Sequence, residues 1–304
     1  MVETIVVGGP AANGLDAEIA KALKARLVKT EHKIFPDGES YIRLPETIEE
    51  EVVVVQSLYP PQDKHLLELL IILDLVKDLG ANKVTAVVPY LAYARQDKRF
   101  KVGEAISVKT VLKCIEKAGA DRLITVDIHK EESLGFFGKP SYNTTVIPEL
   151  TKYLEEKLGD AARDPLKCMV LSPDKGGVNR VKMMAEMLGV GYDYVEKERD
   201  RETGEVRAAP KELDVEGKIV VIVDDIISTG GTIALAARSV KELGAADVYA
   251  MCSHALLVGE AFNKMARSGV REVIAANTVP SPASKISAGP AIIRGLKKLG
   301  ICPD

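Results

Sequence analysis

The residues best suited to chemistry lie where an apolar run gives way to two acids and a turn of small residues. Residues 220–232 read Val-Val-Ile-Val-Asp-Asp-Ile-Ile-Ser-Thr-Gly-Gly-Thr. Gly230 and Gly231 let backbone N–H groups converge without Cβ atoms in the way, and such a turn opening a helix suits a phosphate monoester. Because Asp224 and Asp225 would repel a phosphate, we expect them to accept hydrogen bonds from neutral groups such as ribose hydroxyls. A bare Thr-Gly-Gly-Thr turn would indicate only a helix start, but the two acids before it favour a site for a phosphorylated ribose.

Four other segments place charged, aromatic or metal-ligating side chains at expected turns and strand ends. They read Phe-Pro-Asp-Gly-Glu (35–39), Arg-Gln-Asp-Lys-Arg (95–99), Asp-Ile-His (127–129) with Gly-Phe-Phe-Gly (135–138), and Ser-Pro-Asp-Lys-Gly-Gly (172–177). The first is typical of an Asp-Gly turn between strands. The second belongs to a charged run that is usually a solvated loop, but its arginines also match phosphate oxygens. A lone histidine such as His129 is more often structural than a ligand, although its place after an apolar run favours a functional role.

Short Val/Ile-rich runs alternate with longer amphipathic segments along most of the chain. The strand candidates are Thr4–Val7, Val52–Gln56, Val84–Val88, Leu123–Val126, Met169–Ser172, Ile219–Val223, Val248–Cys252 and Glu272–Ala275. The helix candidates are Leu15–Leu27, Leu66–Leu79, Val108–Lys117, Asn179–Leu188, Thr232–Leu243 and a last short helix, Ala291–Lys298. The strand candidates are almost continuously apolar, as expected where helices cover both faces of a sheet, and the alternation predicts parallel sheets with right-handed crossovers.

A weak internal repeat indicates two domains of one kind. Residues 76–86 (Val-Lys-Asp-Leu-Gly-Ala-Asn-Lys-Val-Thr-Ala) resemble residues 240–250 (Val-Lys-Glu-Leu-Gly-Ala-Ala-Asp-Val-Tyr-Ala), and residues 115–125 are a looser copy. Each copy predicts a helix end, a glycine cap and a buried strand, although any α/β protein repeats this local pattern. We expect an N-terminal domain over 1–143, a C-terminal domain over 144–285, and a C-terminal helix within 286–304 that could pack on the N-terminal domain.

The composition is that of a folded protein without an extended basic surface. The 304 residues are 46% hydrophobic and 28% charged with a net charge of −3, which argues against nucleic-acid and membrane partners. The most apolar stretch, 66–76, is too short for a bilayer and contains Glu68 and Asp74. The cysteines form no CxxC pair, which predicts neither structural zinc nor a disulfide framework. Since the chain starts without a signal-peptide pattern, we expect a soluble cytoplasmic protein.

Taken together, the five segments resemble those of the ribose-phosphate pyrophosphokinase family, also called phosphoribosyl pyrophosphate synthetases. Residues 224–232 alone resemble the phosphoribosyl-pyrophosphate-binding motif that this family shares with phosphoribosyltransferases. The other segments follow the family's order and spacing from residue 35 onward, and the resemblance covers essentially the whole chain. It implies an α/β protein of two similar phosphoribosyltransferase-like domains, each a mostly parallel sheet flanked by helices. It also implies transfer of the pyrophosphoryl group of Mg-ATP to the 1-hydroxyl of ribose 5-phosphate, giving phosphoribosyl pyrophosphate and AMP.

The resemblance further implies roles for individual residues. ATP would be bound by the turn and the basic loop, through Phe35, Asp37, Gly38, Glu39, Arg95, Gln96, Asp97 and Arg99. Ribose 5-phosphate would be bound by Arg199, Asp224, Asp225, Ser228, Thr229, Gly230, Gly231 and Thr232, where Ser228 replaces an aspartate common in the family. His129 and Asp174 would be associated with the cofactor Mg²⁺, and Lys197 and Arg199 would be catalytic by meeting charge that builds on the transferring group. The adenine turn often reaches across from a neighbouring subunit in this family, which implies a homo-oligomer, a dimer or larger.

Two other functions remain open at this point. A phosphoribosyltransferase that consumes the activated sugar would explain residues 224–232 but would leave 35–39 and 95–99 without a role. A non-catalytic regulatory homologue should have lost Lys197, Arg199 or the glycines, and the chain retains them. Formation of AMP from ATP and ribose 5-phosphate separates these alternatives from the synthetase.

Overall fold

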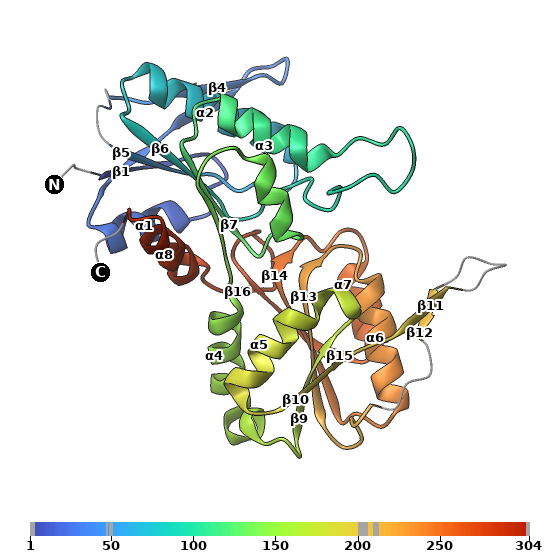
Figure 1. The fold of residues 1–304 in the computed structure, drawn as a ribbon. Coiled ribbons are helices and arrows are strands. Elements are labelled where there is room, and N and C mark those ends of the chain that lie inside the picture. The colour runs from blue at the N-terminus through green and yellow to red at the C-terminus, as the bar shows by residue number, and fades with distance from the viewer. Residues whose placement is uncertain (1–3, 47, 49–50, 200–205, 209–212, 302–304) are drawn as a thin grey trace. The chain divides into compact units, whose positions relative to one another are not determined.

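The chain is organised around two six-stranded sheets, one in each of two units (Figure 1). The computed structural model describes residues 4–46, 48, 51–199, 206–208 and 213–301, with the backbone alone described for 197–199 and 206–208. The first unit comprises Met1–Thr145 together with Ser287–Asp304, and the second comprises Val146–Ile286.

The first unit contains a six-stranded sheet of order β2-β1-β5-β6-β7-β8, in which every pairing is parallel. Its elements are β1 (Thr4–Gly8), α1 (Leu15–Leu23), β2 (Arg26–Lys29), β3 (Glu31–Ile34), β4 (Ser40–Arg43), β5 (Glu51–Val55), α2 (Gln62–Asp78), β6 (Lys83–Val88), α3 (Ser107–Lys117), β7 (Arg122–Val126), η1 (Glu131–Phe136), β8 (Ser141–Thr144) and α8 (Gly289–Lys298). Strands β3 and β4 form a separate antiparallel hairpin.

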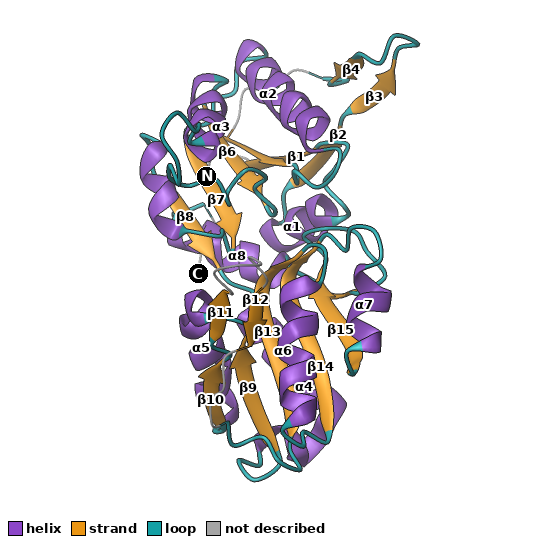
Figure 2. Cartoon of the chain, turned by 90° about the vertical axis from the view of Figure 1, so that its right-hand side faces the viewer, coloured by secondary structure: helices purple, strands orange, loops and turns teal. Residues whose placement is uncertain are grey.

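The second unit repeats this plan with a parallel sheet of order β10-β9-β13-β14-β15-β16. Its elements are α4 (Ile147–Leu158), η2 (Gly159–Arg163), β9 (Cys168–Ser172), η3 (Lys175–Gly177), α5 (Val178–Leu188), β10 (Gly191–Tyr194), β11 (Lys197–Arg199), β12 (Val206–Ala208), β13 (Ile219–Ile227), α6 (Gly231–Glu242), β14 (Asp247–Ala255), α7 (Ala261–Arg267), β15 (Val270–Ala276) and β16 (Ser284–Ile286). In both units a two-stranded hairpin separates the second sheet strand from the third. The prediction of two similar α/β domains is therefore confirmed, and Figure 2 shows helices on both sides of the strands in each unit.

All eight predicted strands are present, because each carries the continuous apolar run that a strand buried on both faces requires. In β5, for example, Val52–Val55 are fully buried. The predicted helix over 15–27 is wrong at its end. Helix α1 stops at Leu23 because Lys24 takes the left-handed conformation (φ 52°), and the chain then pairs with β1 as β2.

Helix α8 packs within the first unit, beside β7, β8 and α1. The Thr144 hydroxyl donates to the carbonyl oxygen of Ala291 at 2.8 Å. A Cβ atom on Gly295 would lie 3.2 Å from Cγ2 of Ile124, so the helix approaches the sheet closely at that glycine. The C-terminal segment thus completes the core of the unit that begins at the N-terminus.

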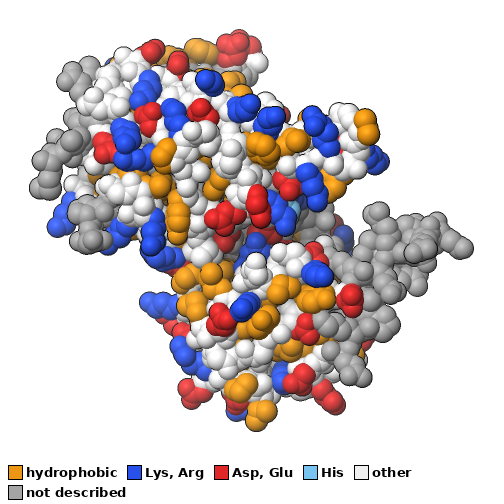
Figure 3. All heavy atoms as spheres, viewed as in Figure 1, with side chains coloured by type: hydrophobic (Ala, Val, Ile, Leu, Met, Phe, Trp, Pro, Cys, Tyr) orange, Lys and Arg blue, Asp and Glu red, His pale blue; other side chains and the backbone are white. Residues whose placement is uncertain are grey.

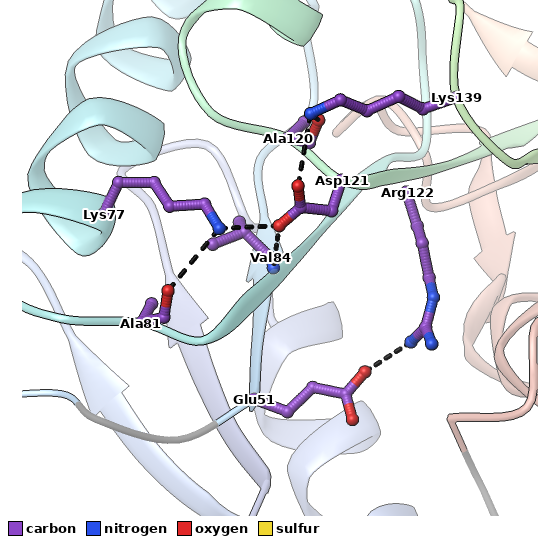
Figure 4. Close-up of polar contacts among 8 residues, drawn as sticks. All are labelled: Glu51, Lys77, Ala81, Val84, Ala120, Asp121, Arg122 and Lys139. Atoms are coloured by element: carbon purple, nitrogen blue, oxygen red, sulfur yellow. Dashed lines mark hydrogen bonds and ion pairs between the residues drawn. The ribbon is translucent and has the colours of Figure 1, made fainter.

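A cluster of charges joins the amino-terminal ends of β6 and β7, at the opposite edge of the sheet from its carboxyl-end loops (Figure 4). The Asp121 carboxylate accepts hydrogen bonds from Lys77 Nζ at 2.6 Å, from the Val84 N–H at 2.9 Å and from Lys139 Nζ at 3.2 Å. Burial alone would raise the pKa of Asp121, but these three donors outweigh it and the pKa is lowered. The cluster therefore has a structural role, in which it holds the amino-terminal ends of β6 and β7 together.

The described surface is mixed in charge. On the face drawn in Figure 3, lysine and arginine side chains are interspersed with aspartate and glutamate. None of the helices in the described part of the chain combines the length and apolar character that a membrane span requires.

Candidate functional site

The two acids of the predicted phosphate loop lie inside a strand, which corrects the expectation that the strand ends before them. Strand β13 continues to Ile227 because β14 runs beside it, pairing Ile226 with His254 and Ile227 with Ala255. The turn is thereby reduced to residues 228–230, and Asp224 and Asp225 are held by the backbone of the sheet.

The turn after β13 opens α6 with free backbone donors. The first hydrogen bond of the helix runs from the Ala234 N–H to the Gly230 carbonyl oxygen at 2.8 Å, and no side chain caps the helix. The N–H groups of residues 230–233 therefore have no intrahelical acceptor. The helix dipole adds a partial positive charge at the same place, so this end of α6 favours an anion.

Only glycine fits at position 230. Its φ is +70°, and a Cβ atom there would lie 3.0 Å from the Ala261 carbonyl oxygen and 3.1 Å from Cγ of Met265. The other side of the turn is fixed by a backbone hydrogen bond, in which the Ser228 carbonyl oxygen accepts from the Val258 N–H at 3.0 Å. Around Gly231, by contrast, a Cβ atom would meet only the Thr229 hydroxyl, at 3.8 Å. The turn is packed on its α7 side and open at Gly231.

A guanidinium lies against the two acids. Nη1 of Arg180, on α5, is 3.8 Å from Oδ1 of Asp224 and 3.9 Å from Oδ1 of Asp225. The Asp225 side chain is 7% exposed and that of Asp224 is 19% exposed, so Asp224 is the one that faces outward. Burial and the neighbouring Asp225 raise the pKa of Asp224 well above its usual range, and Arg180 offsets part of that rise.

A second turn, which is held by its own hydrogen bonds, follows β9, the strand beside β13. Oδ1 of Asp174 accepts from the Gly176 N–H at 2.9 Å, and the Ser172 hydroxyl donates to the Asp174 carbonyl oxygen at 2.5 Å. A Cβ atom on Gly177 would lie 2.6 Å from the Ser172 Oγ and 3.3 Å from Nη1 of Arg180. Strands β9 and β13 are adjacent, and the strand order reverses between them. Ligands of open parallel sheets bind at such a reversal, outside the carboxyl ends of the strands.

The predicted catalytic residues Lys197 and Arg199 fall in the hairpin between β10 and β13. Their backbone forms β11, which pairs antiparallel with β12, Lys197 opposite Ala208 and Arg199 opposite Val206. The side chains of both residues lie outside the described part of the chain.

In the first unit, residues 35–39 form the turn of the β3–β4 hairpin, as their sequence predicts. The Phe35 N–H donates to the Glu39 carbonyl oxygen at 2.8 Å, and Oδ1 of Asp37 accepts from the Glu39 N–H at 3.2 Å. Gly38 has a φ of +99°. The side chains of Phe35, Asp37 and Glu39 are all exposed, and Phe35 meets Tyr41 edge to face with ring centroids 6.0 Å apart.

The basic loop after β6 is mostly exposed and is ordered by a glutamate. Oε2 of Glu104 accepts from the N–H groups of Phe100 and Lys101 at 2.8 and 3.0 Å, and Nε of Arg99 donates to the Glu104 carbonyl oxygen at 2.9 Å. Arg95 is exposed. The Gln96 N–H donates to the Tyr93 carbonyl oxygen at 3.1 Å. Gln96 and Asp97 are half-buried.

His129 follows β7 on a constrained turn of the first unit. Asp127 has a φ of +40° and its N–H donates to the Thr144 carbonyl oxygen at 2.8 Å. The Ile128 N–H donates to Oδ1 of Asn143 at 2.9 Å, which leaves His129 half-buried at the carboxyl edge of the sheet. Among the residues that the structure describes, no three histidine, cysteine, aspartate or glutamate side chains gather as a metal cluster.

Arg180 is the site residue that the sequence reasoning missed. Its signal was a cation in the first turn of a helix that has no acid there. The helix dipole disfavours such a charge, so an acidic partner elsewhere was to be expected.

The second unit has the fold of the phosphoribosyltransferase-like domains, and comparison with known families shows the same class. Residues 143–284 match the family model of the phosphoribosyl transferase domain, and residues 4–119 match that of the N-terminal domain of ribose phosphate pyrophosphokinase. The ribose-phosphate pyrophosphokinase of Sulfurisphaera tokodaii is 50% identical over 295 residues, covering 95% of this chain and 99% of the relative. That of Sulfolobus acidocaldarius is 47% identical over 285 residues, covering 93% and 96%.

A solved structure extends the comparison to the whole fold. The phosphoribosylpyrophosphate synthetase from Mycobacterium smegmatis superimposes with a TM-score of 0.86 at 32% identity, covering 98% of this chain and 99% of the other. The chain belongs to the ribose-phosphate pyrophosphokinase family.

Proposed function

We propose that this chain transfers the pyrophosphoryl group of Mg-ATP to the 1-hydroxyl of ribose 5-phosphate, giving 5-phosphoribosyl 1-pyrophosphate and AMP. One observation carries the proposal. The uncapped start of α6 comes directly after a strand that presents two acids, so a phosphate site and a hydroxyl site are adjacent on one backbone segment. Membership of the family fixes the reaction, since its relatives are ribose-phosphate pyrophosphokinases.

The 5-phosphate of the sugar would bind at residues 228–232. The N–H groups at the start of α6 would donate to its oxygens, and the hydroxyls of Ser228, Thr229 and Thr232 would add donors. The contact of Gly230 with α7 keeps the turn in the conformation that aims these amides. A turn that is fixed before the ligand arrives would lower the entropy cost of binding.

The ribose ring would bind at Asp224 and Asp225, which would accept hydrogen bonds from its 2- and 3-hydroxyls. A carboxylate must be ionised to accept at both oxygens, and burial opposes ionisation of Asp224. Arg180 counters this by placing its charge within 4 Å of both acids. We therefore infer that Arg180 shifts Asp224 toward the accepting form and offsets part of the effect of burial.

ATP would bind to the first unit's exposed turn and basic loop. The Phe35 ring would stack on adenine, with Asp37, Gly38 and Glu39 contacting the base and ribose edges. Arg95, Gln96, Asp97 and Arg99 would contact the polyphosphate, for which guanidinium groups are well shaped.

The donor set fits Mg²⁺ as a cofactor shared with the polyphosphate. Mg²⁺ is bound mainly by phosphate oxygens and waters and needs only one or two protein ligands. Asp174, whose Oδ1 accepts from the Gly176 N–H, would be the Mg²⁺-associated residue of the second unit, and His129 would be that of the first unit. When bound, the ion neutralises charge on the transferring group.

In the transfer step, the 1-hydroxyl oxygen of the sugar attacks the β-phosphorus of ATP, the hydroxyl proton is released to solvent, and the bond from that phosphorus to the bridging α–β oxygen breaks, so AMP leaves. Lys197 and Arg199 would close over the transferring group and meet its charge, and Arg199 would also contact ribose 5-phosphate. We further propose a cytoplasmic homo-oligomer, a dimer or larger, in which a neighbouring subunit completes the ATP site.

The test is a product assay by ³¹P NMR with ATP, ribose 5-phosphate and Mg²⁺. We expect AMP and phosphoribosyl pyrophosphate in equal amounts and no ADP. Lys197→Ala should lower kcat by about 100-fold, as expected for the loss of a cation aimed at transition-state charge. Lys182→Ala, which removes an exposed lysine of α5, is the matched control and should leave kcat unchanged. Formation of ADP, or no turnover unless a base and phosphoribosyl pyrophosphate are supplied, would refute the proposal.

A further inference from the structure

The first unit contains a fully buried carboxylate that the proposed reaction does not use. Glu68, on α2, has no exposed surface and lies on the helix face that also buries Leu69 and Ile72. Burying a carboxylate is costly unless charges and hydrogen-bond donors surround it. Its partners therefore indicate what the residue does.

Two of the partners of Glu68 come from the β3–β4 hairpin. The Ser40 hydroxyl, on β4, donates to Oε1 of Glu68 at 2.9 Å. Nε2 of His32, on β3, lies 2.9 Å from the same oxygen. Lys64, one turn earlier on α2, has its Nζ 3.6 Å from Oε1. One carboxylate oxygen thus contacts both strands of the hairpin.

The other oxygen of Glu68 is tied to the main sheet. Nε2 of Gln56 donates to Oε2 at 3.4 Å and to the His65 carbonyl oxygen at 3.3 Å. Oε1 of Gln56 in turn accepts from the Ala11 N–H at 2.8 Å, and Gln56 is fully buried directly after β5. Glu68 therefore connects the hairpin to the carboxyl end of the first unit's sheet.

The hairpin needs such a connection because its two strands are not part of the main sheet. Strands β3 and β4 pair only with each other among the described strands, and most of their side chains are exposed or half-exposed. Two-stranded hairpins are marginally stable in water by themselves. Figure 2 shows the pair projecting past the end of the main sheet, with the turn 35–39 at its tip. Ser40 pairs with Ile34, at the last step before this turn, so its anchor fixes where the turn points.

We propose that Glu68 is a positioning residue for the nucleotide, which holds the hairpin so that the turn 35–39 meets the adenine of ATP. This inference depends on the proposed function of that turn. It predicts that loss of the anchor weakens binding of the base while leaving binding of the polyphosphate and of ribose 5-phosphate unchanged.

The experiment compares variants by calorimetry with two probes, a non-hydrolysable ATP analogue and inorganic tripolyphosphate, which lacks the base. Ser40→Ala removes one hydrogen bond to Glu68 without creating a new buried charge. It should weaken binding of the ATP analogue about 2–10-fold, which is the effect of losing one hydrogen bond. Glu68→Ala should weaken it by about 10-fold or more. Tripolyphosphate affinity, and KM for ribose 5-phosphate, should stay within about 2-fold for both variants. Ser40→Thr keeps the hydroxyl and should restore the affinity, and Asp74→Asn is the control at an exposed acid of the same helix.

The outcomes separate the inference from the function on which it depends. If Ser40→Ala binds the analogue as tightly as the wild type while Phe35→Ala weakens it, the turn binds adenine and the positioning role is refuted. If Phe35→Ala also has no effect, the turn does not bind adenine and both proposals fail. Equal losses for the analogue and tripolyphosphate in Ser40→Ala would also overturn the inference, because they would reflect a general loss of structure.

Discussion

Replacing Arg180 by methionine should destabilise the second unit in a manner that depends on pH. The substitution keeps an unbranched, though shorter, side chain and removes the charge that lies 3.8 and 3.9 Å from the two acids. Without it, burial and the neighbouring Asp225 oppose ionisation of Asp224 with less to offset them, so the variant should take up a proton more readily.

The magnitude follows from the distances. Two unit charges at this separation attract by about 4 kcal/mol at an effective dielectric constant near 20. Arg180 gives up part of this through its own desolvation, and breaking a buried pair from one side typically costs about 3–5 kcal/mol. We therefore expect Arg180→Met to lower the free energy of unfolding by about 3 kcal/mol at pH 8, where wild-type Asp224 is more ionised than in acid.

The sign of the pH dependence is fixed by the pKa of Asp224. Burial and Asp225 raise this pKa and Arg180 lowers it, so the variant holds its proton to a higher pH than the wild type. At acid pH both proteins carry the proton and Arg180 has less charge to neutralise. The stability difference should therefore shrink by about 1 kcal/mol or more between pH 8 and pH 5.

The assay is urea denaturation followed by circular dichroism at both pH values, with the KM for ribose 5-phosphate measured in parallel. Arg238→Met, at an exposed arginine of α6, is the matched control and should change stability by no more than about 0.5 kcal/mol at either pH. KM for ribose 5-phosphate should rise about 5–10-fold in Arg180→Met, since one acceptor is lost to the proton. A stability loss that is equal at both pH values, or a variant that is more stable at pH 8, would refute the reasoning.

Three further substitutions follow from the same structure. Gly230→Ala should lower the free energy of unfolding by about 1–3 kcal/mol and weaken ribose 5-phosphate binding at least about 10-fold, because its Cβ would press on the Ala261 carbonyl at a φ of +70°. Scanning and titration calorimetry measure the stability and the affinity. Asp224→Asn should raise the thermal midpoint most at alkaline pH, since a raised pKa makes the ionised form costly in the folded state, while it weakens ribose 5-phosphate binding. Asp121→Asn should destabilise most at neutral pH and least in acid, since Lys77 and the other donors lower that pKa in the folded state, and thermal melts between pH 3 and 7 check it.

Each of these has a clear contrary result. Normal sugar affinity in Gly230→Ala would mean that the turn does not bind the phosphate. An Asp224→Asn variant that is less stable than the wild type at alkaline pH would mean that the ionised form of Asp224 stabilises the folded state. A loss in Asp121→Asn that grows toward acid pH would reverse the assigned sign.

The strands at the centre of both sheets could be predicted from the sequence, and those at the edges could not. Each central strand is buried on both faces and therefore reads as an unbroken apolar run. The four edge strands β2, β8, β10 and β16 were missed because edges are partly exposed and tolerate polar residues. In β10, for example, Gly191 and Tyr192 are exposed and Asp193 and Tyr194 are half-buried.

The turn at residues 228–230 could be predicted because its signal is local. Glycines, hydroxyls and acids occur within one short segment, and each has one physical reason to be there. Arg180 and Glu68 could not be placed, because their partners are brought together only by the folded sheets. Glu68 even appears in the sequence as an interruption of an apolar stretch, and only its contacts with Ser40 and Gln56 give it a role.

The most direct test of the central claim is a crystal structure of the protein with ribose 5-phosphate. We predict that the 5-phosphate lies within hydrogen-bond distance of the N–H groups of residues 230–232 and that the ring hydroxyls contact Asp224 and Asp225. A sugar phosphate bound elsewhere, with these amides left to solvent, would contradict the account.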